Sequence, residues 1–509
     1  MGVEAMGGER AFSRGEVFGF FILASLLYVF PIIHADYAYI DDNWRALLWA
    51  DEAWRNQGRV LAEGVTKFLA FNNASINIFP LPLLIATFVL AHAMSLLTFW
   101  FFSRPRWSAC LVVLPILCNP FFLGNISYQY DGPGMMLAVA AAIYALTCNR
   151  GSVYLRGALS ALLLAVMLSL YQLTVTVFIS LCFVECMWNV RNKIPARVVL
   201  LGLGQRALHL ALGGFVYYLT AFQMVVSSRG SFIPLDQHWF EVVSGKLLFS
   251  MERVLELVNS GNFYFSILIL LVAGIEFIRL GKNIFILEGG RGDRLLVLAV
   301  YLLVIPVLIV GVPGAMLLLD EKNIFARNFL GFSGVLFFLF LLNYECLGRV
   351  WSGLRLLLII PVLCMYSLCF AYGQVIVAKK ELETALATFI AYDIIATDEL
   401  KPSKVIFFIG PRANGNWLPM GHPAMSYMPV LRYILSNASE LLHPQFFPRL
   451  GINNVDGRTR EVFEAAMSSS KMSKLVVDRK FYSIYITESG DFIVMKEIVD
   501  SEKYMDDPW

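Results

Sequence analysis

The chain has 509 residues, of which 58% are hydrophobic and only 15% are charged, and its mean hydropathy is +0.66. Soluble chains carry roughly a quarter charged residues, so a protein that is solvated on all sides is excluded. The 40 Lys and Arg against 38 Asp and Glu leave a net charge of +2, which gives no basic surface for nucleic acid.

Eleven apolar runs are long enough to cross ~30 Å of hydrocarbon as helices. They lie near residues 16–34, 78–102, 108–123, 133–148, 155–170, 173–188, 207–227, 262–280, 295–319, 329–347 and 355–377. Pro115 interrupts the third run, and the fifth and sixth runs meet at Tyr171-Gln172. No small-residue cleavage pattern follows the first run, so we expect an uncleaved first span.

The distribution of Lys and Arg predicts the orientation of these spans. With the N-terminus inside, the short inner segments hold sixteen Lys and Arg, whereas the longer outer loops hold nine. Because basic residues resist translocation in short loops, we expect a cytoplasmic N-terminus and, with eleven spans, a periplasmic C-terminus.

Residues 378–509 differ in kind from the rest of the chain. They contain 15 Lys and Arg, 17 Asp and Glu, and no run long enough to span a membrane. The pattern predicts a helix over 381–395, a strand over 404–410, a helix over 459–469 and a closing hairpin over 482–498.

The predicted fold is therefore an all-α polytopic membrane protein with a small C-terminal α+β periplasmic domain. Residues 1–377 form the transmembrane domain, with a first periplasmic loop at 35–77, and residues 378–509 form the C-terminal domain.

The densest polar cluster in the outer half follows the first span, in the sequence HADYAYIDDNWRALLWADEAWRNQGR. From Asn43 on, apolar residues repeat at helical spacing, which predicts an interfacial helix with its tryptophans at headgroup level. Asp41 and Asp42 precede that helix, and Asp at this position caps helices. The alternative is a general base: Arg45 keeps at least one carboxylate ionised, and the arginine itself can meet a phosphate.

Two further groups of polar residues lie at predicted outer helix ends. Tyr128 and Asp131 belong to the short loop NPFFLGNISYQYDGPG, which is either a turn with interfacial tyrosines or a shelf that binds a sugar. Tyr171 and Gln172 lie between two spans, where the choice is between an interfacial anchor and a contact to sugar or acceptor.

Outward-facing cations matter because a departing lipid phosphate needs its charge stabilised. Besides Arg45, the candidates are Arg229, Lys322 and Arg327, each of which could equally be a solvated or snorkelling side chain.

Several other kinds of site have no support in the sequence. The eight cysteines lie in or at the ends of apolar runs, and the histidines of the tail lack companions at ligand spacing, so we expect no metal. No phosphate-binding glycine loop and no serine-hydrolase motif is present. We expect no cofactor and no nucleotide-sugar donor.

The residues that carry a family resemblance are YIDDNWR after the first span and NPFFLGNISYQYD before the fourth. Together with the predicted interfacial helix, they resemble the serotype-converting O-antigen glucosyltransferases of the GT-C class, most strongly over residues 16–190. The family more often has DDYGR, with glycine where this chain has Trp44.

The resemblance implies a bacterial inner-membrane enzyme that takes glucose from undecaprenyl-phosphate-glucose and places it on lipid-linked O-antigen (lipopolysaccharide) repeats at the periplasmic face. It implies an Asp of the first outer loop as the base, here Asp41 or Asp42, and it matches Tyr128 and Asp131 to a second family segment. Two alternatives remain open: a transporter or flippase of lipid-linked sugars, and a GT-C-like polymerase or transferase of another sugar.

Overall fold

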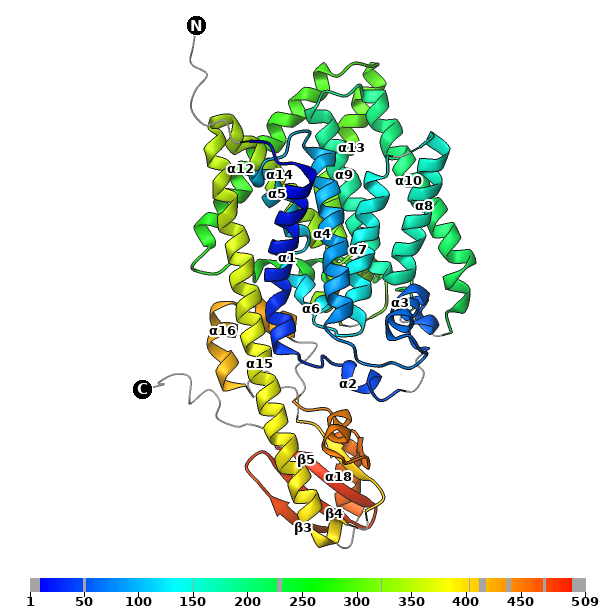
Figure 1. The fold of residues 1–509 in the computed structure, drawn as a ribbon, viewed down its shortest axis with the longest axis vertical. Helices are drawn as coiled ribbons and strands as arrows, with labels where there is room; N and C mark the ends of the chain where they lie inside the picture. The colour runs from blue at the N-terminus through cyan, green and yellow to red at the C-terminus, as the bar shows by residue number, and fades with distance from the viewer. Residues whose placement is uncertain are drawn as a thin grey trace. The chain divides into compact units, whose positions relative to one another are not determined.

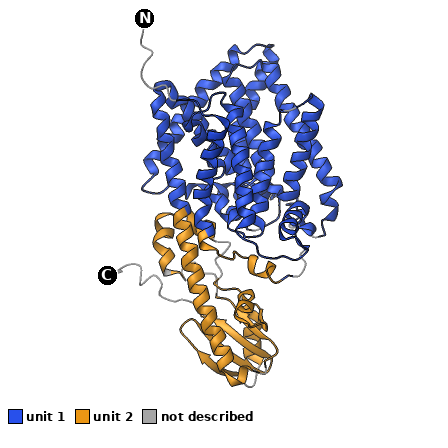
Figure 2. Cartoon of the chain, viewed as in Figure 1, with its two compact units in different colours: residues 1–33, 48–369 blue, residues 34–47, 370–509 orange. Residues whose placement is uncertain are grey.

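The computed structural model describes residues 10–48, 52–149, 151–226, 231–321, 323–401, 403–411, 418–435, 441–469 and 473–496. The chain divides into two compact units (Figure 2). Unit 1 comprises residues 1–33 and 48–369, and unit 2 comprises residues 34–47 and 370–509.

Apolar helices long enough to cross a membrane dominate the described residues: nine helices qualify, or ten if one bent pair counts as a span. They are built on α1 (Arg14–Ala35), α4 (Leu81–Phe101), α8 (Val153–Leu170), α9 (Val175–Arg191), α10 (Ala196–Leu219), α12 (Phe263–Gly281), α13 (Arg291–Gly311), α14 (Phe332–Val350) and α15 (Ile359–Ala396). A shorter apolar helix, α7, covers Asp131–Thr147. The predicted polytopic helical membrane fold is confirmed.

The third predicted span is a broken helix. It consists of α5 (Trp107–Val113) with a 3₁₀ turn at Leu114–Ile116, then a second 3₁₀ turn at Pro120–Phe122 and α6 (Leu123–Ile126), with a bend of 50° between the halves. Proline lacks the N–H that a continuing helix needs and restricts the residue before it. At the break, the side chain of Asn119 accepts a hydrogen bond from Phe121 N–H at 3.1 Å, which replaces part of the missing helix bonding.

Close helix packing builds the centre of unit 1 (Figure 1). Helix α7 packs between α4 and α8, and α8 packs on α10. A Cβ on Gly213 of α10 would lie 2.7 Å from the Ala161 carbonyl oxygen of α8, so this contact depends on the absence of a side chain. Helices α10, α12 and α13 instead expose large apolar side chains, as expected for surfaces that face lipid.

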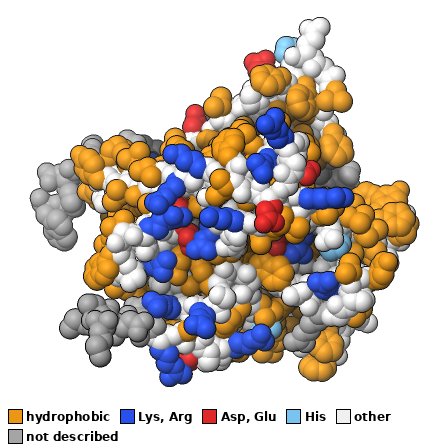
Figure 3. Space-filling model, turned by 90° about the horizontal axis from the view of Figure 1, so that it is seen from above, with side chains coloured by type: hydrophobic (Ala, Val, Ile, Leu, Met, Phe, Trp, Pro, Cys, Tyr) orange, Lys and Arg blue, Asp and Glu red, His pale blue; other side chains and the backbone are white. Residues whose placement is uncertain are grey.

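The segments predicted to be cytoplasmic contact one another at one end of unit 1. Arg191 and Arg206 pair with Glu345 and Glu185, at 2.9 and 3.0 Å, and Phe12 N–H donates to the Pro105 carbonyl oxygen. Figure 3 views the molecule toward the end where α1 begins, and basic side chains predominate over acidic ones on that face.

Unit 2 contains a five-stranded sheet in the order β2-β1-β5-β4-β3. The strands are β1 (Ile406–Ile409), β2 (Val455–Gly457), β3 (Ser473–Asp478), β4 (Tyr482–Thr487) and β5 (Gly490–Met495). Strand β1 runs parallel to both β2 and β5, whereas β3, β4 and β5 are antiparallel. Helix α18 (Arg460–Ser469) packs Phe463 against Phe492 of β5. The predicted strand at 404–410, the hairpin and the helix at 459–469 are confirmed.

Unit 2 also contains two short helices, α16 (His422–Tyr427) and α17 (Val430–Leu435), which the sequence pattern did not predict. The helix predicted at 381–395 is confirmed, but it is not separate from the last span, because both belong to one helix, α15, ~57 Å long at 1.5 Å per residue. No glycine or proline lies between residues 378 and 396 to stop it.

Candidate functional site

The paired aspartates belong to residues 34–47 of unit 2, which we call the acid segment. Its one helix, α2, covers only Asp42–Arg45. The Asp42 side chain is buried, with 1% of the residue exposed, and its Oδ2 accepts a hydrogen bond from Tyr39 N–H at 2.8 Å. Asp41 is half-buried, and its carboxylate makes no capping hydrogen bond to α2. The two carboxylates therefore have different surroundings although they are neighbours.

The backbone immediately before the acids has an unusual conformation. Ile40 has φ of +50°, in the left-handed region. A β-branched residue rarely adopts this region, and holding it there costs on the order of 1–3 kcal/mol. Strain of this kind persists only where surrounding contacts impose it, and it is concentrated at functional sites. Here it turns the chain directly into Asp41.

Contacts inside unit 2 impose that conformation. Lys380 of α15 donates to the Ala35 carbonyl oxygen at 3.1 Å and to Asp36 Oδ2 at 3.3 Å. Tyr39 OH donates to the carbonyl oxygen of Ile434, at 3.4 Å. The acid segment is thus attached to the helix and to the loops of the C-terminal domain.

A buried ion pair lies beside these attachments. Lys379 Nζ and Glu383 Oε1 are 2.5 Å apart, both side chains are almost fully buried, and Glu383 also accepts a hydrogen bond from Leu442 N–H at 3.0 Å. The Lys379 ammonium lies 5.6 Å from the centre of the Tyr37 ring. Burial first, and then the Glu383 carboxylate, raise the pKa of Tyr37 well above its usual value, so this phenol stays protonated.

Arg45 is buried within the acid segment. Its guanidinium carbon lies 5.7 Å from the centre of the Trp44 ring, and the backbone N–H of Arg45 donates to the Asp41 carbonyl oxygen at 2.9 Å. Because Arg45 follows Asp41 by about one helical turn, the short helix α2 fixes the spacing between the Asp41 and Arg45 backbones.

The predicted interfacial helix from Asn43 onward is wrong as a continuous element. Helix α2 ends at Arg45, and residues 49–51 lie outside the described part of the chain. Trp54 does not lie on an outer surface: the residue is 1% exposed and clusters with Tyr130. Its amphipathic spacing reflects a tertiary contact, in which the indole packs inward and donates a hydrogen bond.

That hydrogen bond leads into a second polar cluster, in unit 1. Trp54 Nε1 donates to Asp131 Oδ1 at 2.7 Å, and Arg59 Nη1 lies 3.6 Å from the same oxygen. Asp131 begins α7 and is buried. A carboxylate at a helix N-terminus is favoured by the helix dipole, and here it also holds the first loop on the helix bundle.

Arg59 connects Asp131 to the break between α8 and α9. Its guanidinium carbon lies 4.7 Å from the centre of the Tyr171 ring, and its Nε donates to Gln172 Oε1 at 3.3 Å. Gln172 in turn donates to the Gln57 carbonyl oxygen at 2.8 Å and to Tyr217 OH at 3.0 Å. The structure therefore brings together three of the predicted residues, Asp131, Tyr171 and Gln172, around an arginine. We call these three, with Trp54 and Arg59, the loop cluster.

Another contact between distant residues joins Tyr128, which lies shortly before α7, to Arg327, which precedes α14. The Arg327 guanidinium donates to Tyr128 OH, and its carbon lies 5.2 Å from the centre of the Phe325 ring. The Arg327 carbonyl oxygen accepts from Asn125 Nδ2 at 3.1 Å. Tyr128 is buried and its phenol oxygen accepts the hydrogen bond from Arg327, whereas Arg327 is only half-buried.

Two predicted phosphate-binding cations, Arg229 and Lys322, lie outside the described residues. Across the described ranges, no group of three or more His, Cys, Asp or Glu is placed to hold a metal ion.

The sequence pattern gave Trp54 a different role, as an interfacial side chain, and did not single out Arg59, Gln57 or Tyr217, nor the pair Lys379 and Glu383. Arg59 was visible as an outer cation, but nothing in one sequence links it to Asp131, 72 positions later. Lys379 and Glu383 carry a weak signal, since Lys and Glu four apart on a helix can pair, but their burial comes only from the fold.

Comparison with known proteins gives two matches. Residues 30–344 match the model of the family described as Glucosyl transferase GtrII. A curated relative from Salmonella phage P22, described as an uncharacterized 55.3 kDa protein in the gtrB 5′ region, is 26% identical over 249 residues. This alignment covers 48% of the present chain and 51% of the relative, so the chain spans about half the length of that protein. No solved structure matches.

Proposed function

The chain belongs to the GtrII glucosyltransferase family, and on that premise we propose that it transfers glucose to O-antigen repeat units. The donor is a polyprenyl-phosphate-linked glucose, and the acceptor is the lipid-linked O-antigen glycan. Transfer takes place at the periplasmic face of the bacterial inner membrane. Such a donor is already activated by its phosphate, so the reaction requires neither a nucleotide nor ATP.

The observation that carries this proposal is the acid segment. It presents a half-buried carboxylate, Asp41, beside a buried one, Asp42, immediately after the first apolar helix. A strained residue and several attachments hold it in place. This is what general-base catalysis at a lipid boundary needs: a carboxylate that is reachable and immobile.

We assign different roles to the two acids. Asp41 is the general base, because its carboxylate is partly accessible and makes no capping bond to α2. Asp42 is a positioning residue, because its Oδ2 closes the turn at Tyr39. Asp42 thus stabilises the backbone conformation that makes the Asp41 carboxylate accessible.

The proposed reaction is a single displacement. Asp41 takes the proton of an acceptor hydroxyl while the hydroxyl oxygen forms a bond to the anomeric carbon. The bond between that carbon and the phosphate oxygen breaks, and the phosphate leaves with the electron pair. Attack from the opposite face gives inversion. Arg45, four residues after Asp41 in the same segment, is the cation that we propose for the phosphate charge.

Expression in a host with a known O-polysaccharide tests this function. We expect each repeat unit to gain one hexose, seen by mass and linkage analysis, and the chain carrying Asp41→Asn to add none. A longer or newly polymerised glycan would favour the polymerase alternative. Movement of the lipid-linked sugar across vesicles with no new glycosidic bond would identify a transporter instead.

A further inference from the structure

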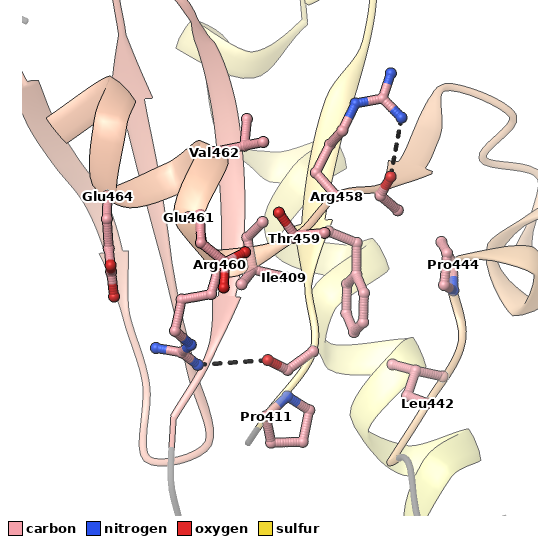
Figure 4. Close-up of a pocket in the computed structure, with 13 residues that line it drawn as sticks. Ile409, Pro411, Leu442, Pro444, Arg458, Thr459, Arg460, Glu461, Val462 and Glu464 are labelled. Atoms are coloured by element: carbon pink, nitrogen blue, oxygen red, sulfur yellow. Dashed lines mark hydrogen bonds between the residues drawn. The ribbon is translucent and has the colours of Figure 1, made fainter. Parts of the chain in front are cut away.

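A cleft lies in unit 2, on the sheet of the C-terminal domain. It has a volume of about 810 Å³ and opens where β1 and β2 end and α18 begins (Figure 4). Ligand sites of α/β folds lie outside the carboxyl ends of parallel strands, where connections leave in different directions. Strand β1 is parallel to β2 and β5, and the chain leaves β2 into α18.

Glycines mark both strand ends. Gly410 directly follows β1, and an added Cβ there would meet nothing within 4 Å, so the backbone lies open to the cleft. Gly457 ends β2. Small ligands reach backbone groups most easily where no side chain covers them.

One wall of the cleft is apolar. It is formed by Phe408, Ile409, Leu442, Pro444 and Val462. Val462, in the first turn of α18, lines the cleft and is 44% exposed. Phe408, Ile409 and Leu442 are almost fully buried, so Pro444 and Val462 supply most of the apolar surface that can cover the C–H face of a sugar ring.

The polar side of the cleft carries equal numbers of positive and negative side chains. Arg458 and Arg460 supply donors, and Glu461 and Glu464 supply acceptors. The Arg458 guanidinium is fixed by Asp456 at 2.7 Å, and Arg460 donates to the carbonyl oxygens of Gly410 at 3.4 Å and Met495 at 3.2 Å. A hydrogen bond from Thr459 lowers the pKa of Glu461, so this acceptor is ionised at neutral pH.

The charge balance distinguishes between classes of ligand. Two cations and two anions give the lining no net charge, which does not favour a phosphate or a nucleotide. Sugar hydroxyls both donate and accept, so a neutral oligosaccharide can use every member of this set. The volume lies within the range of about 300–1,000 Å³ that small-molecule sites occupy.

We propose that this cleft binds the acceptor glycan, as a neutral oligosaccharide of several sugar residues. The proposal rests on the proposed glucosyltransfer and assigns the C-terminal domain a part in it. Binding in this cleft contributes affinity for the acceptor through residues other than those of the acid segment.

The test uses the full chain in membranes, supplied with lipid-linked glucose and with O-polysaccharide oligosaccharide from the host that gains hexose. We expect Val462→Trp, which fills the cleft, to raise KM for the acceptor about tenfold, or ~1.4 kcal/mol, while KM for the donor stays unchanged. The matched control is Ser468→Trp on the same helix, which does not line the cleft and should leave both constants within about twofold of wild type. An acceptor KM that is equal in the two variants would overturn the proposal.

A binding measurement separates this proposal from the function itself. The same oligosaccharide is titrated against the full chain carrying Asp41→Asn, with and without Val462→Trp. We expect saturable binding that weakens about tenfold with the tryptophan, even if the wild-type chain transfers no glucose. Equal affinities would overturn the cleft assignment, whereas absent transfer with intact binding would overturn only the glucosyltransfer.

Discussion

The acid segment of unit 2 and the loop cluster of unit 1 each hold an aspartate near a helix end, Asp41 and Asp131, and the surroundings of these two carboxylates are opposite. Asp131 is buried and receives a tryptophan N–H and an arginine. Asp41 is half-buried and follows a strained isoleucine. A carboxylate such as Asp131, whose oxygens already accept hydrogen bonds from the protein, stabilises the fold. A carboxylate such as Asp41, whose oxygens are accessible to a substrate, can accept a proton.

The strongest way to test this comparison is to neutralise each member of the acid pair. We expect Asp41→Asn to lower the rate of hexose transfer by about 10²–10⁴, the usual contribution of a general base. Asp42→Asn should lower the rate of hexose transfer by a smaller factor, because the amide oxygen can still accept a hydrogen bond from Tyr39 N–H. The measurement is initial transfer rate in vesicles, normalised to folded protein. Equal losses in both variants would remove the division of roles.

A second change targets what holds the acid segment. We expect Glu383→Leu to destabilise the protein by about 3–5 kcal/mol, since it leaves the Lys379 ammonium buried without its partner. Thermal or denaturant unfolding in detergent measures the loss. The matched control is the double variant Lys379→Met/Glu383→Leu, which removes both charges and should recover most of the stability. Failure of the double variant to recover would mean that the ion pair is not the cause.

A packing change away from the aspartates shows how much a loss of stability alone affects glucose transfer. A Cβ on Gly331, at the start of α14, would lie 1.9 Å from the Gly311 carbonyl oxygen, so Gly331→Ala should cost about 1–3 kcal/mol by overpacking. Gly274→Ala in α12 meets nothing within 4 Å and serves as control. Transfer per folded molecule should stay unchanged in both. A selective loss of transfer in Gly331→Ala would show that backbone damage can imitate loss of a base.

The smallest effect is expected at the loop cluster. Asp131→Asn keeps an acceptor for Trp54 but removes the charge facing Arg59, which should cost about 1 kcal/mol of stability. Transfer per folded molecule should remain within about threefold of wild type. A loss as large as that of Asp41→Asn, with the fold intact, would place Asp131 among the catalytic groups.

Much of the fold follows from hydrophobic run length, and the exceptions have local causes. Pro115 predicts an interrupted third run, and the structure bends by 50° between the two halves of that run. The length of α15 was missed because a change from apolar to mixed composition was taken for a helix end. Composition changes where a helix leaves a membrane, but only a helix-breaking residue or a cap ends it.

Individual residues of the candidate site could be predicted from the sequence, but the contacts between them could not. Asp131, Tyr171 and Gln172 were found from their positions at predicted outer helix ends, and the structure joins them through Arg59. The spacing of Trp54 predicted an interfacial side chain, although the indole is buried on Asp131. Contacts between residues so far apart depend on packing, which the pattern of one sequence does not contain.

Chemical rescue measures the central claim most directly. In the chain carrying Asp41→Ala, a small external carboxylate such as formate can enter the space left by the side chain and act as the base. The account predicts that formate restores hexose transfer in Asp41→Ala in a concentration-dependent way and does not restore it in Asp42→Ala. Full activity of Asp41→Ala without formate, or rescue of Asp42→Ala alone, would contradict the assignment of Asp41 as the base.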